Sequence, residues 1–241
     1  MGKIIITGTS SGLGDGLARY LSSRNHQVYG ISRKDNAKLR KCASYHHVFA
    51  DLTERNALEN VMKPIFKAEK EWDLLVLNAG VLGEIGDMHE VSAASMKSVM
   101  EINLWANKYL MDLLIKADVK VHQVVAISSG AAVNGNRGWN AYSLSKAALN
   151  MMIQLYAQEL PETHFSALAP GLVDTDMQAH IVSVKSDARF PSFDQLRAAR
   201  GTDQMPRPLE LAPKLLEAMD ALKTNYPSGS FADIRTINFT G

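Results

Sequence analysis

Short apolar, β-branched runs alternate along the chain with longer segments of helical periodicity, and this alternation constrains the fold more than any other feature. The runs lie at residues 3–7, 26–31, 45–50, 72–78, 121–128, 164–169 and 230–237. The helical segments lie at residues 13–24, 53–70, 92–116 and 142–160, with a further helix expected to end at residue 223. Runs that are apolar almost throughout are typical of parallel strands covered on both faces. The sequence therefore predicts an α/β fold, with a doubly wound parallel sheet of about seven strands flanked by helices on both faces.

The charged residues nearly cancel, since 26 Lys and Arg face 25 Asp and Glu in 241 residues, for a formal charge of +1. Such a chain has no overall field to recruit a polyanion, so we expect neither nucleic acid nor a membrane surface as a partner. The length suits one domain over residues 1–241. The single Cys42, together with the absence of a leader or membrane span, predicts a cytoplasmic protein. The sequence has no HExxH or CxxC motif, so no metal site is expected.

A glycine-rich turn, TGTSSGLG at residues 7–14, separates the first predicted strand from the first predicted helix. Glycine permits a sharp turn and close approach to a ligand, and a helix N-terminus offers unpaired N–H groups to a pyrophosphate. A dinucleotide is the expected ligand, although glycines also occur in plain strand-to-helix loops. The predicted contacts are Gly8, Ser10, Ser11, Gly12, Leu13 and Gly14.

The second predicted strand ends in Ser32, Arg33 and Lys34, where a dinucleotide site would meet the adenosine ribose. An acidic residue there would bind the 2′-hydroxyl of NAD, whereas arginine can hold a phosphate with two parallel hydrogen bonds. We therefore expect NADP(H) to be preferred, with NAD(H) possible. The alternative is an ordinary solvated basic loop.

Tyr142 and Lys146 stand four positions apart, so they would share one face of a helix. Such pairs are frequent on helix surfaces, and the pair alone favours that interpretation. Ser129 lies thirteen residues before Tyr142, directly after the apolar run VVAIS. The carboxyl end of that strand should face the dinucleotide, so the three side chains are candidates for a catalytic group.

Taken together, these motifs resemble the short-chain dehydrogenase/reductase family over essentially the whole chain. They occur in family order as TGTSSGLG, Asp51, Asn78-Ala79-Gly80, Asn103, Ser129, YxxxK, Pro170-Gly171 and Thr175. The resemblance implies a Rossmann-type domain that binds NAD(P) and moves hydride between the nicotinamide and a carbonyl or alcohol carbon. The stretches GWNAYSLSKAALNMM, PGLVDTDMQ and SGSFADI are similar to the sepiapterin reductase and benzil reductase branch. This branch implies a small carbonyl or vicinal dicarbonyl substrate, while a role for Asp233 in gripping a pterin stays open.

The resemblance also implies a role for each matched residue. Tyr142 would be the acid/base, Ser129 would bind the substrate oxygen, and Lys146 would hold the nicotinamide ribose and lower the pKa of Tyr142. Asn103 would complete a water-linked proton relay. Further cofactor contacts are implied at Asp51, Leu52, Asn78, Ala79, Gly80, Pro170, Gly171, Val173 and Thr175. Capping or turn roles are the alternatives for Asp51, Asn78 and Thr175.

The role of Lys146 has a physical basis. A free phenol has a pKa near 10, and bringing it to about 7 requires roughly 4 kcal/mol in favour of the phenolate. A unit charge at about 4 Å supplies roughly that amount at an effective dielectric constant near 20, before desolvation is counted. We therefore expect Lys146 to make Tyr142 acidic, and Tyr142 to give its proton as hydride reaches the carbonyl carbon.

Several alternatives stay open at this stage. Residues 174–208 are irregular, and we expect either a segment that covers the substrate or a poorly packed surface excursion. Trp105, Trp139 and Met177 could line an aromatic-accepting pocket or belong to the core. The chain could instead be a non-catalytic dinucleotide-binding sensor or interaction protein of the same fold. An extended-branch epimerase is disfavoured because 95 residues follow Lys146. The resemblance makes a homodimer or homotetramer the expected assembly, through the helices that carry Asn103 and Tyr142.

Overall fold

The computed structural model describes residues 1–183 and 187–239. Its main sheet has seven parallel strands in the spatial order β3-β2-β1-β5-β7-β8-β9. These strands are β1 Lys3–Thr7, β2 Gln27–Ser32, β3 Tyr45–Phe49, β5 Leu74–Leu77, β7 Gln123–Ile127, β8 His164–Ala169 and β9 Ser230–Asp233. The strand order reverses between β1 and β5, which is the position where open α/β sheets bind ligands. The predicted doubly wound sheet is confirmed.

Two of the predicted strands are each broken in two. The run at 72–78 divides into β4 (Glu71–Trp72) and β5, and the run at 121–128 divides into β6 (Lys120–Val121) and β7. Strands β4 and β6 pair with each other in a separate two-stranded sheet. A continuous apolar run does not reveal such a break, because both halves are equally suited to burial.

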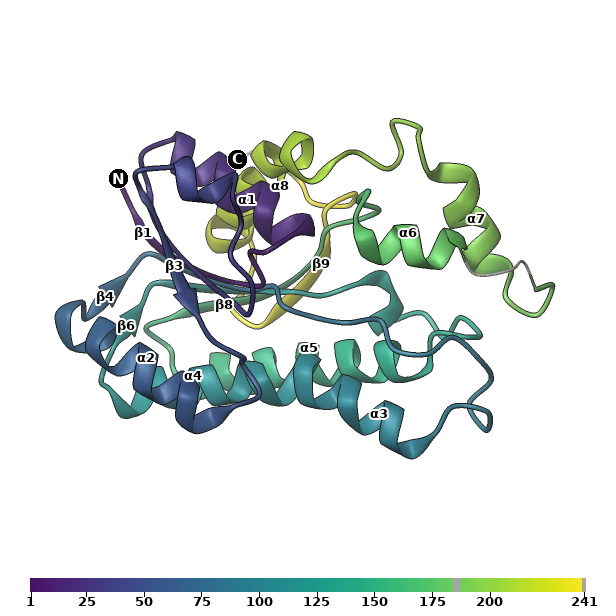
Figure 1. Cartoon of the computed structure of the whole chain (residues 1–241), viewed down its shortest axis with the longest axis horizontal. Coiled ribbons are helices and arrows are strands. Elements are labelled where there is room, and N and C mark those ends of the chain that lie inside the picture. Colours follow the sequence, from purple (N-terminus) through teal and green to yellow (C-terminus); the bar gives the residue numbers. More distant parts are fainter. Residues whose placement is uncertain (184–186, 240–241) are drawn as a thin grey trace.

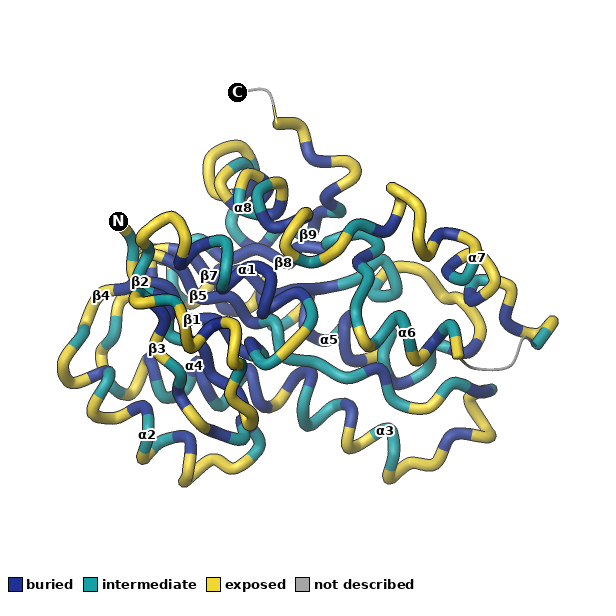
Figure 2. The backbone as a smooth tube through the Cα atoms, turned by 45° about the horizontal axis from the view of Figure 1, so that its top comes forward, coloured by how far each residue is buried: buried dark blue, intermediate teal, exposed yellow. Residues whose placement is uncertain are grey.

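Helices cover both faces of the main sheet (Figure 1), with α1 and α8 on one face and α2, α4 and α5 on the other. The helices are α1 Gly12–Ser23, α2 Arg55–Ala68, α3 Ala93–Met100, α4 Ala106–Lys116, α5 Asn140–Glu159, α6 Asp176–Ser183, α7 Pro191–Ala199 and α8 Pro208–Asn225, with short 3₁₀ turns η1 Leu39–Lys41 and η3 Gly130–Ala132. In β1, Ile4 and Ile6 pack with α1 and α8, whereas Ile5 packs with the opposite layer. Figure 2 shows the buried strands between helices whose outer faces are exposed. Successive side chains of a strand therefore point to opposite faces of the sheet and contribute to two separate hydrophobic cores.

The segment predicted as one helix over 92–116 contains a π-helical turn. Helix α3 begins after Ser92, whose hydroxyl accepts a hydrogen bond from the Ser95 N–H at 3.1 Å. The π-helical turn η2 (Glu101–Trp105) follows and leads directly into α4. Such turns interrupt the regular hydrogen-bond ladder and are frequent at functional sites. Here the turn carries Asn103.

Helices α6 and α7 lie within the segment 174–208, of which residues 184–186 lie outside the described part. Both helices sit to one side of the sheet, above the start of α5 in Figure 1. Their apolar residues form a third cluster that includes Leu82 and partly buried Trp139, Tyr142 and Met177. The described part of this segment is therefore packed on the region around Tyr142. Within the described residues, no helix is both long and apolar enough to cross a membrane.

Candidate active site

The backbone of the glycine-rich turn lies very close to helix α1 and to the loop after β5. Gly8 and Gly12 have φ of +76° and +62°, in the left-handed region that favours glycine. A Cβ atom on Gly14 would lie 2.3 Å from the Gly8 carbonyl oxygen, so α1 packs too closely on the turn for a side chain there. Asn78 Nδ2 donates to the Thr7 carbonyl at 2.8 Å, and Thr7 Oγ1 accepts from the Asn78 and Ala79 N–H groups. The turn and the loop after β5 therefore form one rigid unit.

A cleft of about 960 Å³ opens along the carboxyl ends of the central strands. It is lined by nearly all of the predicted cofactor contacts, namely Gly8, Ser10, Ser11, Gly12, Leu13, Ser32, Arg33, Lys34, Asp51, Leu52, Asn78, Ala79, Gly80, Tyr142, Lys146, Pro170, Gly171, Val173 and Thr175. Among the described residues, the predicted Gly14, Asn103 and Ser129 are not part of this lining. Gly14 instead serves helix packing, as its missing Cβ indicates.

Some lining residues were not predicted from the sequence. They include Val81, Leu82, Gly83, Ile102, Ile127, Ser128, Gln178 and His180. These residues could have been found from the sequence, because they lie next to strand ends or next to predicted contacts. Residues at the carboxyl ends of parallel strands lie at the same edge of the sheet. Thr175 stands just before α6, where its hydroxyl accepts from the Gln178 N–H at 3.4 Å. It can therefore cap the helix and line the cleft at the same time.

The adenosine end of the cleft carries both signs of charge. Arg33 is 67% exposed, and its Nη1 lies 3.6 Å from Asp51 Oδ2. Burial acts to raise the pKa of Asp51, but hydrogen bonds from Thr53 and the charge of Arg33 hold it below its usual value. Asp35, which was not among the predicted contacts, also lines the cleft. Its carboxylate is held by Arg40 at 2.6 Å.

The three catalytic candidates lie close together: Tyr142 and Lys146 line the cleft, and the Ser129 hydroxyl interacts with that of Tyr142. Ser129 lies two residues after the end of β7, and its hydroxyl accepts from the Ala131 N–H at 3.1 Å as the cap of a 3₁₀ turn. Lys146 Nζ donates to the Ile127 carbonyl at 2.6 Å and lies 5.7 Å from the centre of the Tyr142 ring. The predicted shared face of the helix is confirmed. It points toward the end of β7 rather than to solvent.

The electrostatics differ from the sequence-based expectation. Burial raises the pKa of Tyr142, and the Ser129 hydroxyl acts in the opposite direction without reversing the effect. Burial lowers the pKa of Lys146 to about 8, against the hydrogen bond to Ile127, which favours the ammonium. The pKa of Tyr142 is therefore shifted in the direction opposite to the expected one, and a lowering of this pKa by Lys146 stays a prediction. Desolvation of the phenol is the largest cause of this shift, and the Lys146 Nζ is bound to the Ile127 carbonyl at the end of β7.

Asn103 is fully buried and ties three segments together. Its amide oxygen accepts from the Val81 N–H at 2.8 Å, and its Nδ2 donates to the Val81 carbonyl and to Ser145 Oγ, both at 2.9 Å. Its own carbonyl accepts from Asn107 Nδ2 at 2.8 Å. A Cβ atom on Gly80 would lie 3.2 Å from Asn103 Oδ1 and 3.5 Å from Lys146 Nζ. Asn103 thus lies beside Lys146 and fixes the loop after β5 to α5.

Aromatic side chains pack against Tyr142. The Trp139 ring lies 5.8 Å from the Tyr142 ring and is stacked on Phe193 at 4.9 Å. Met177 lines the cleft, as the pocket interpretation predicts. Trp105 does not belong to this group, because 42% of it is exposed on the outer surface of the turn η2.

Residues 2–186 match the family described as short chain dehydrogenase. The chain belongs to this family. It is 32% identical over 246 residues to a benzil reductase ((S)-benzoin forming) of Bacillus cereus, with 95% of this chain and 97% of that protein covered. It is 28% identical over 209 residues to the sepiapterin reductase of Bos taurus, with 77% and 78% covered. The crystal structure of the Saccharomyces cerevisiae short chain dehydrogenase/reductase YIR035C superposes with a TM-score of 0.83 at 28% identity, covering 97% and 96%. The predicted family and branch are confirmed.

As a member of the short-chain dehydrogenase family, the chain is an oxidoreductase of the class that links a CH–OH group and NAD(P). The cleft fits such a cofactor, because its floor is the glycine-rich turn, where Gly8 and Gly12 line it without side chains. Over residues 1–183 and 187–239, no group of three or more His, Cys, Asp or Glu side chains is arranged to hold a metal ion.

Proposed function

We propose that the protein reduces a small carbonyl or dicarbonyl compound with NADPH, and that Tyr142 donates the proton. One observation supports this proposal most strongly: the Tyr142 hydroxyl interacts with the Ser129 hydroxyl, and its ring centre lies 5.7 Å from Lys146 Nζ, in a cleft whose floor is the glycine-rich turn. The bound cofactor would supply the hydride. Every other task falls to side chains of the chain itself.

The raised pKa of Tyr142 suits a proton donor, because the phenol keeps its proton at neutral pH. Ser129 would donate a hydrogen bond to the substrate oxygen and stabilise the negative charge that develops there. Lys146, with a pKa of about 8, is mostly an ammonium at pH 7, so it can attract the phenolate that proton donation leaves behind. It would also hold the nicotinamide ribose. Asn103, beside Lys146, would position the relay that returns a proton to the tyrosine.

The preference for NADP(H) rests on Arg33 and Lys34 at the end of β2. Arg33 is largely exposed and only loosely paired with Asp51, so its guanidinium can turn to a 2′-phosphate. Asp35 does not compete strongly, since Arg40 already holds it. Arg33→Ala should raise the KM for NADPH much more than the KM for NADH. Equal effects on both would mean that the basic loop does not read the 2′-phosphate.

The substrate class is supported by the apolar cluster around Tyr142 and by the benzil reductase of Bacillus cereus among the relatives. A vicinal diketone offers an oxygen for Ser129 and a flat apolar body for the surrounding side chains. A pterin is a weaker candidate, because the carboxylate of Asp233 is occupied by Arg235 at 2.6 Å. Consumption of NADPH over diketones, aldehydes, keto esters and pteridines would rank these classes.

The direct test replaces Tyr142 by Phe and measures turnover and NADPH binding separately. The variant should lose turnover while binding NADPH nearly as tightly as the wild type. Retained activity would exclude Tyr142 as the proton donor. A wild-type protein that binds NADPH but oxidises it with no carbonyl compound would favour the alternative, a non-catalytic dinucleotide sensor of the same fold.

The proposed assembly is a homodimer or homotetramer. Helix α5 exposes Leu144, Met151 and Leu155, and Trp105 of the π-helical turn is also exposed. Large apolar side chains on neighbouring outer surfaces of a helical layer are typical of an association surface. We further propose that the described part of 174–208 covers the substrate. A cytoplasmic location stays a prediction from composition.

A further inference from the structure

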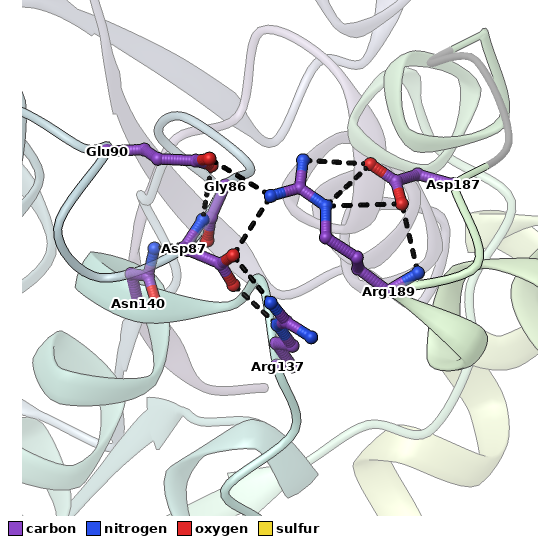
Figure 3. Close-up of polar contacts among 7 residues, drawn as sticks. All are labelled: Gly86, Asp87, Glu90, Arg137, Asn140, Asp187 and Arg189. Carbon is purple, nitrogen blue, oxygen red and sulfur yellow. Dashed lines mark hydrogen bonds and ion pairs between the residues drawn. The ribbon is translucent and has the colours of Figure 1, made fainter.

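Three segments far apart in the sequence meet beside the first turn of α5. Residues 86–90 follow β5, residues 137–140 lead into the helix that carries Tyr142, and residues 187–193 lie at the start of α7. Figure 3 shows their polar side chains pointing toward one another. The contacts form a continuous network across all three segments.

Asp87 is the centre of this network. Arg137 donates from Nε and Nη2 to its two carboxylate oxygens at 2.5 and 2.6 Å, and Arg189 Nη1 donates to Oδ2 at 2.9 Å. The carboxylate is only 12% exposed although both arginines reach solvent. Hydrogen bonds from Arg137 lower the pKa of Asp87 to about 2, so it is charged at every pH of interest. Two cations from different segments are thus bound to one anion.

Arg189 joins the third segment to the other two. Beyond Asp87 it binds Glu90 at 3.0 Å and Asp187 at 2.9 Å. Its guanidinium also lies 4.9 Å from the centre of the Phe190 ring, within the range of a cation–π contact. The ion pairs therefore fix Arg189, and with it the neighbouring Phe190, whose ring is buried in the aromatic cluster.

Gly138 shows how closely these aromatic rings press on the start of α5. Its φ is +93°, and a Cβ atom there would lie 2.8 Å from the ring of Phe190 and 2.9 Å from that of Phe193. On either side, Trp139 Nε1 donates to Ser192 Oγ at 2.9 Å and Asn140 Nδ2 donates to the Gly86 carbonyl at 2.6 Å. Residues 137–140 are held from both flanks immediately before Tyr142.

We propose that Asp87 and Arg189 are positioning residues that clamp the start of α5 between the 86–90 loop and the Phe190–Phe193 pair. They would so fix the aromatic wall behind Tyr142, which consists of Trp139, Phe190 and Phe193. This inference rests on the proposed function. Neither side chain touches the reacting atoms. Each acts through Trp139, whose ring lies between Phe193 and Tyr142. Leu82 and Met177 pack in the same cluster as these rings and line the cleft. The clamp therefore favours flat aryl carbonyl compounds, which can contact Leu82 and Met177, over small aliphatic ones, which reach only Tyr142 and Ser129.

The first experiment measures the clamp without activity. Hydrogen exchange is followed in peptides covering 137–146 and 187–199 for the wild type, Arg189→Ala and Asp87→Asn. Exchange in both peptides should rise roughly tenfold in each variant, because local opening becomes easier when a cooperative network is broken. Arg189→Lys should restore part of the protection. The matched control is Lys3→Ala, which breaks the ion pair between Lys3, the first residue of β1, and Glu69. It should leave the exchange of both peptides unchanged. Unchanged exchange in both variants would overturn the clamp.

The second experiment compares benzil with butane-2,3-dione under saturating NADPH. Arg189→Ala and Asp87→Asn should raise the KM for benzil roughly three- to tenfold, the range expected for residues coupled in one ionic network, with kcat nearly unchanged. The KM for butane-2,3-dione should change less than twofold. Gly138→Ala, which displaces the rings without altering a charge, should reproduce the same selectivity. Equal loss for both substrates would overturn the role in positioning the wall.

The two proposals fail in different ways. If the wild type reduces neither these diketones nor any other carbonyl compound of the panel, the proposed function fails, and hydrogen exchange alone decides whether the clamp exists. If the wild type reduces both and the variants discriminate as expected, both proposals stand. If reduction is intact but exchange and selectivity are unaffected, only the clamp is refuted.

Discussion

Replacing the buried Lys146 by Met removes a charge that folding must desolvate. Burial lowers the pKa of this lysine from 10.5 to about 8, while its Nζ donates to the Ile127 carbonyl. A cation whose pKa is lower in the folded state destabilises the protein wherever the ammonium form is dominant. The penalty is therefore complete below pH 8, shrinks as the pH rises from 8 to 10.5, and is absent above 10.5.

The size of the penalty follows from the two pKa values. Their difference, 10.5 minus about 8, corresponds to about 3 kcal/mol at 1.36 kcal/mol per pH unit. The Lys146→Met variant would lack the penalty but would also leave the Ile127 carbonyl without its donor, at a cost of about 1–3 kcal/mol that does not depend on pH. The absolute stability of the variant is thus a balance of two terms. The pH dependence of the difference in unfolding free energy between the wild type and Lys146→Met depends on the lysine alone. Between pH 7 and pH 9.5 this difference should shift by about 2 kcal/mol in favour of the wild type.

Urea unfolding at fixed protein concentration, from pH 7 to 9.5, measures this change for the wild type and Lys146→Met. Fixed concentration keeps any contribution from subunit association constant. Tyr142 does not confuse the comparison, because its raised pKa keeps the phenol neutral below pH 10 in both proteins. The variant should also lose turnover. A stability difference that stays constant within about 0.5 kcal/mol over this range would refute the desolvated ammonium.

Three other changes test the rest of the architecture. Gly14→Ala should lower the free energy of unfolding by more than about 2 kcal/mol, since its Cβ would lie 2.3 Å from the Gly8 carbonyl, and a smaller loss in urea unfolding would show that α1 can shift away. Asn103→Ala leaves the Val81 N–H and carbonyl without their partners, so it should lower the free energy of unfolding by roughly 2–4 kcal/mol in the same assay. The variant should also lose turnover, and full activity would contradict the place of Asn103 in the site. Met151→Asp places a charge on the exposed apolar surface of α5 and should reduce the mass found by sedimentation. An unchanged mass would place the interface elsewhere.

Features that depend on neighbouring residues were predictable from the sequence. β1 and β8 match their predicted runs residue for residue, because strands buried on both faces need apolar side chains throughout. The glycine turn also lies where predicted, since positive φ at Gly8 and Gly12 admits few other residues. Such constraints are local, so each leaves a mark within a few residues.

Features that depend on distant residues were not predictable. The ion pairs of Asp87 join residues that are 50 and 102 positions apart, and no local pattern distinguishes them from solvated surface charges. The π-helical turn at Asn103 was also missed, because the apolar period of the surrounding helix continues through it. The direction of the pKa shift at Tyr142 depends on burial by α6, α7 and the 80–92 loop. Helical spacing gives the neighbour of a side chain but not its exposure to water.

Burial acts oppositely on the two central groups of the site, and this changes the role of the cation. It raises the pKa of the Tyr142 phenol and lowers that of the Lys146 ammonium, so both are driven toward their neutral forms. At pH 7 the phenol is protonated and the ammonium, with a pKa of about 8, still carries its charge. Before reaction the site therefore holds one positive charge and a neutral acid. In the proposed reaction, loss of the proton from Tyr142 would leave a phenolate close to the Lys146 ammonium in a largely desolvated site, where the attraction between the two charges is strongest. Lys146 would then contribute most after the proton has left, because the low dielectric that opposes ionisation of Tyr142 alone strengthens the ion pair that ionisation creates.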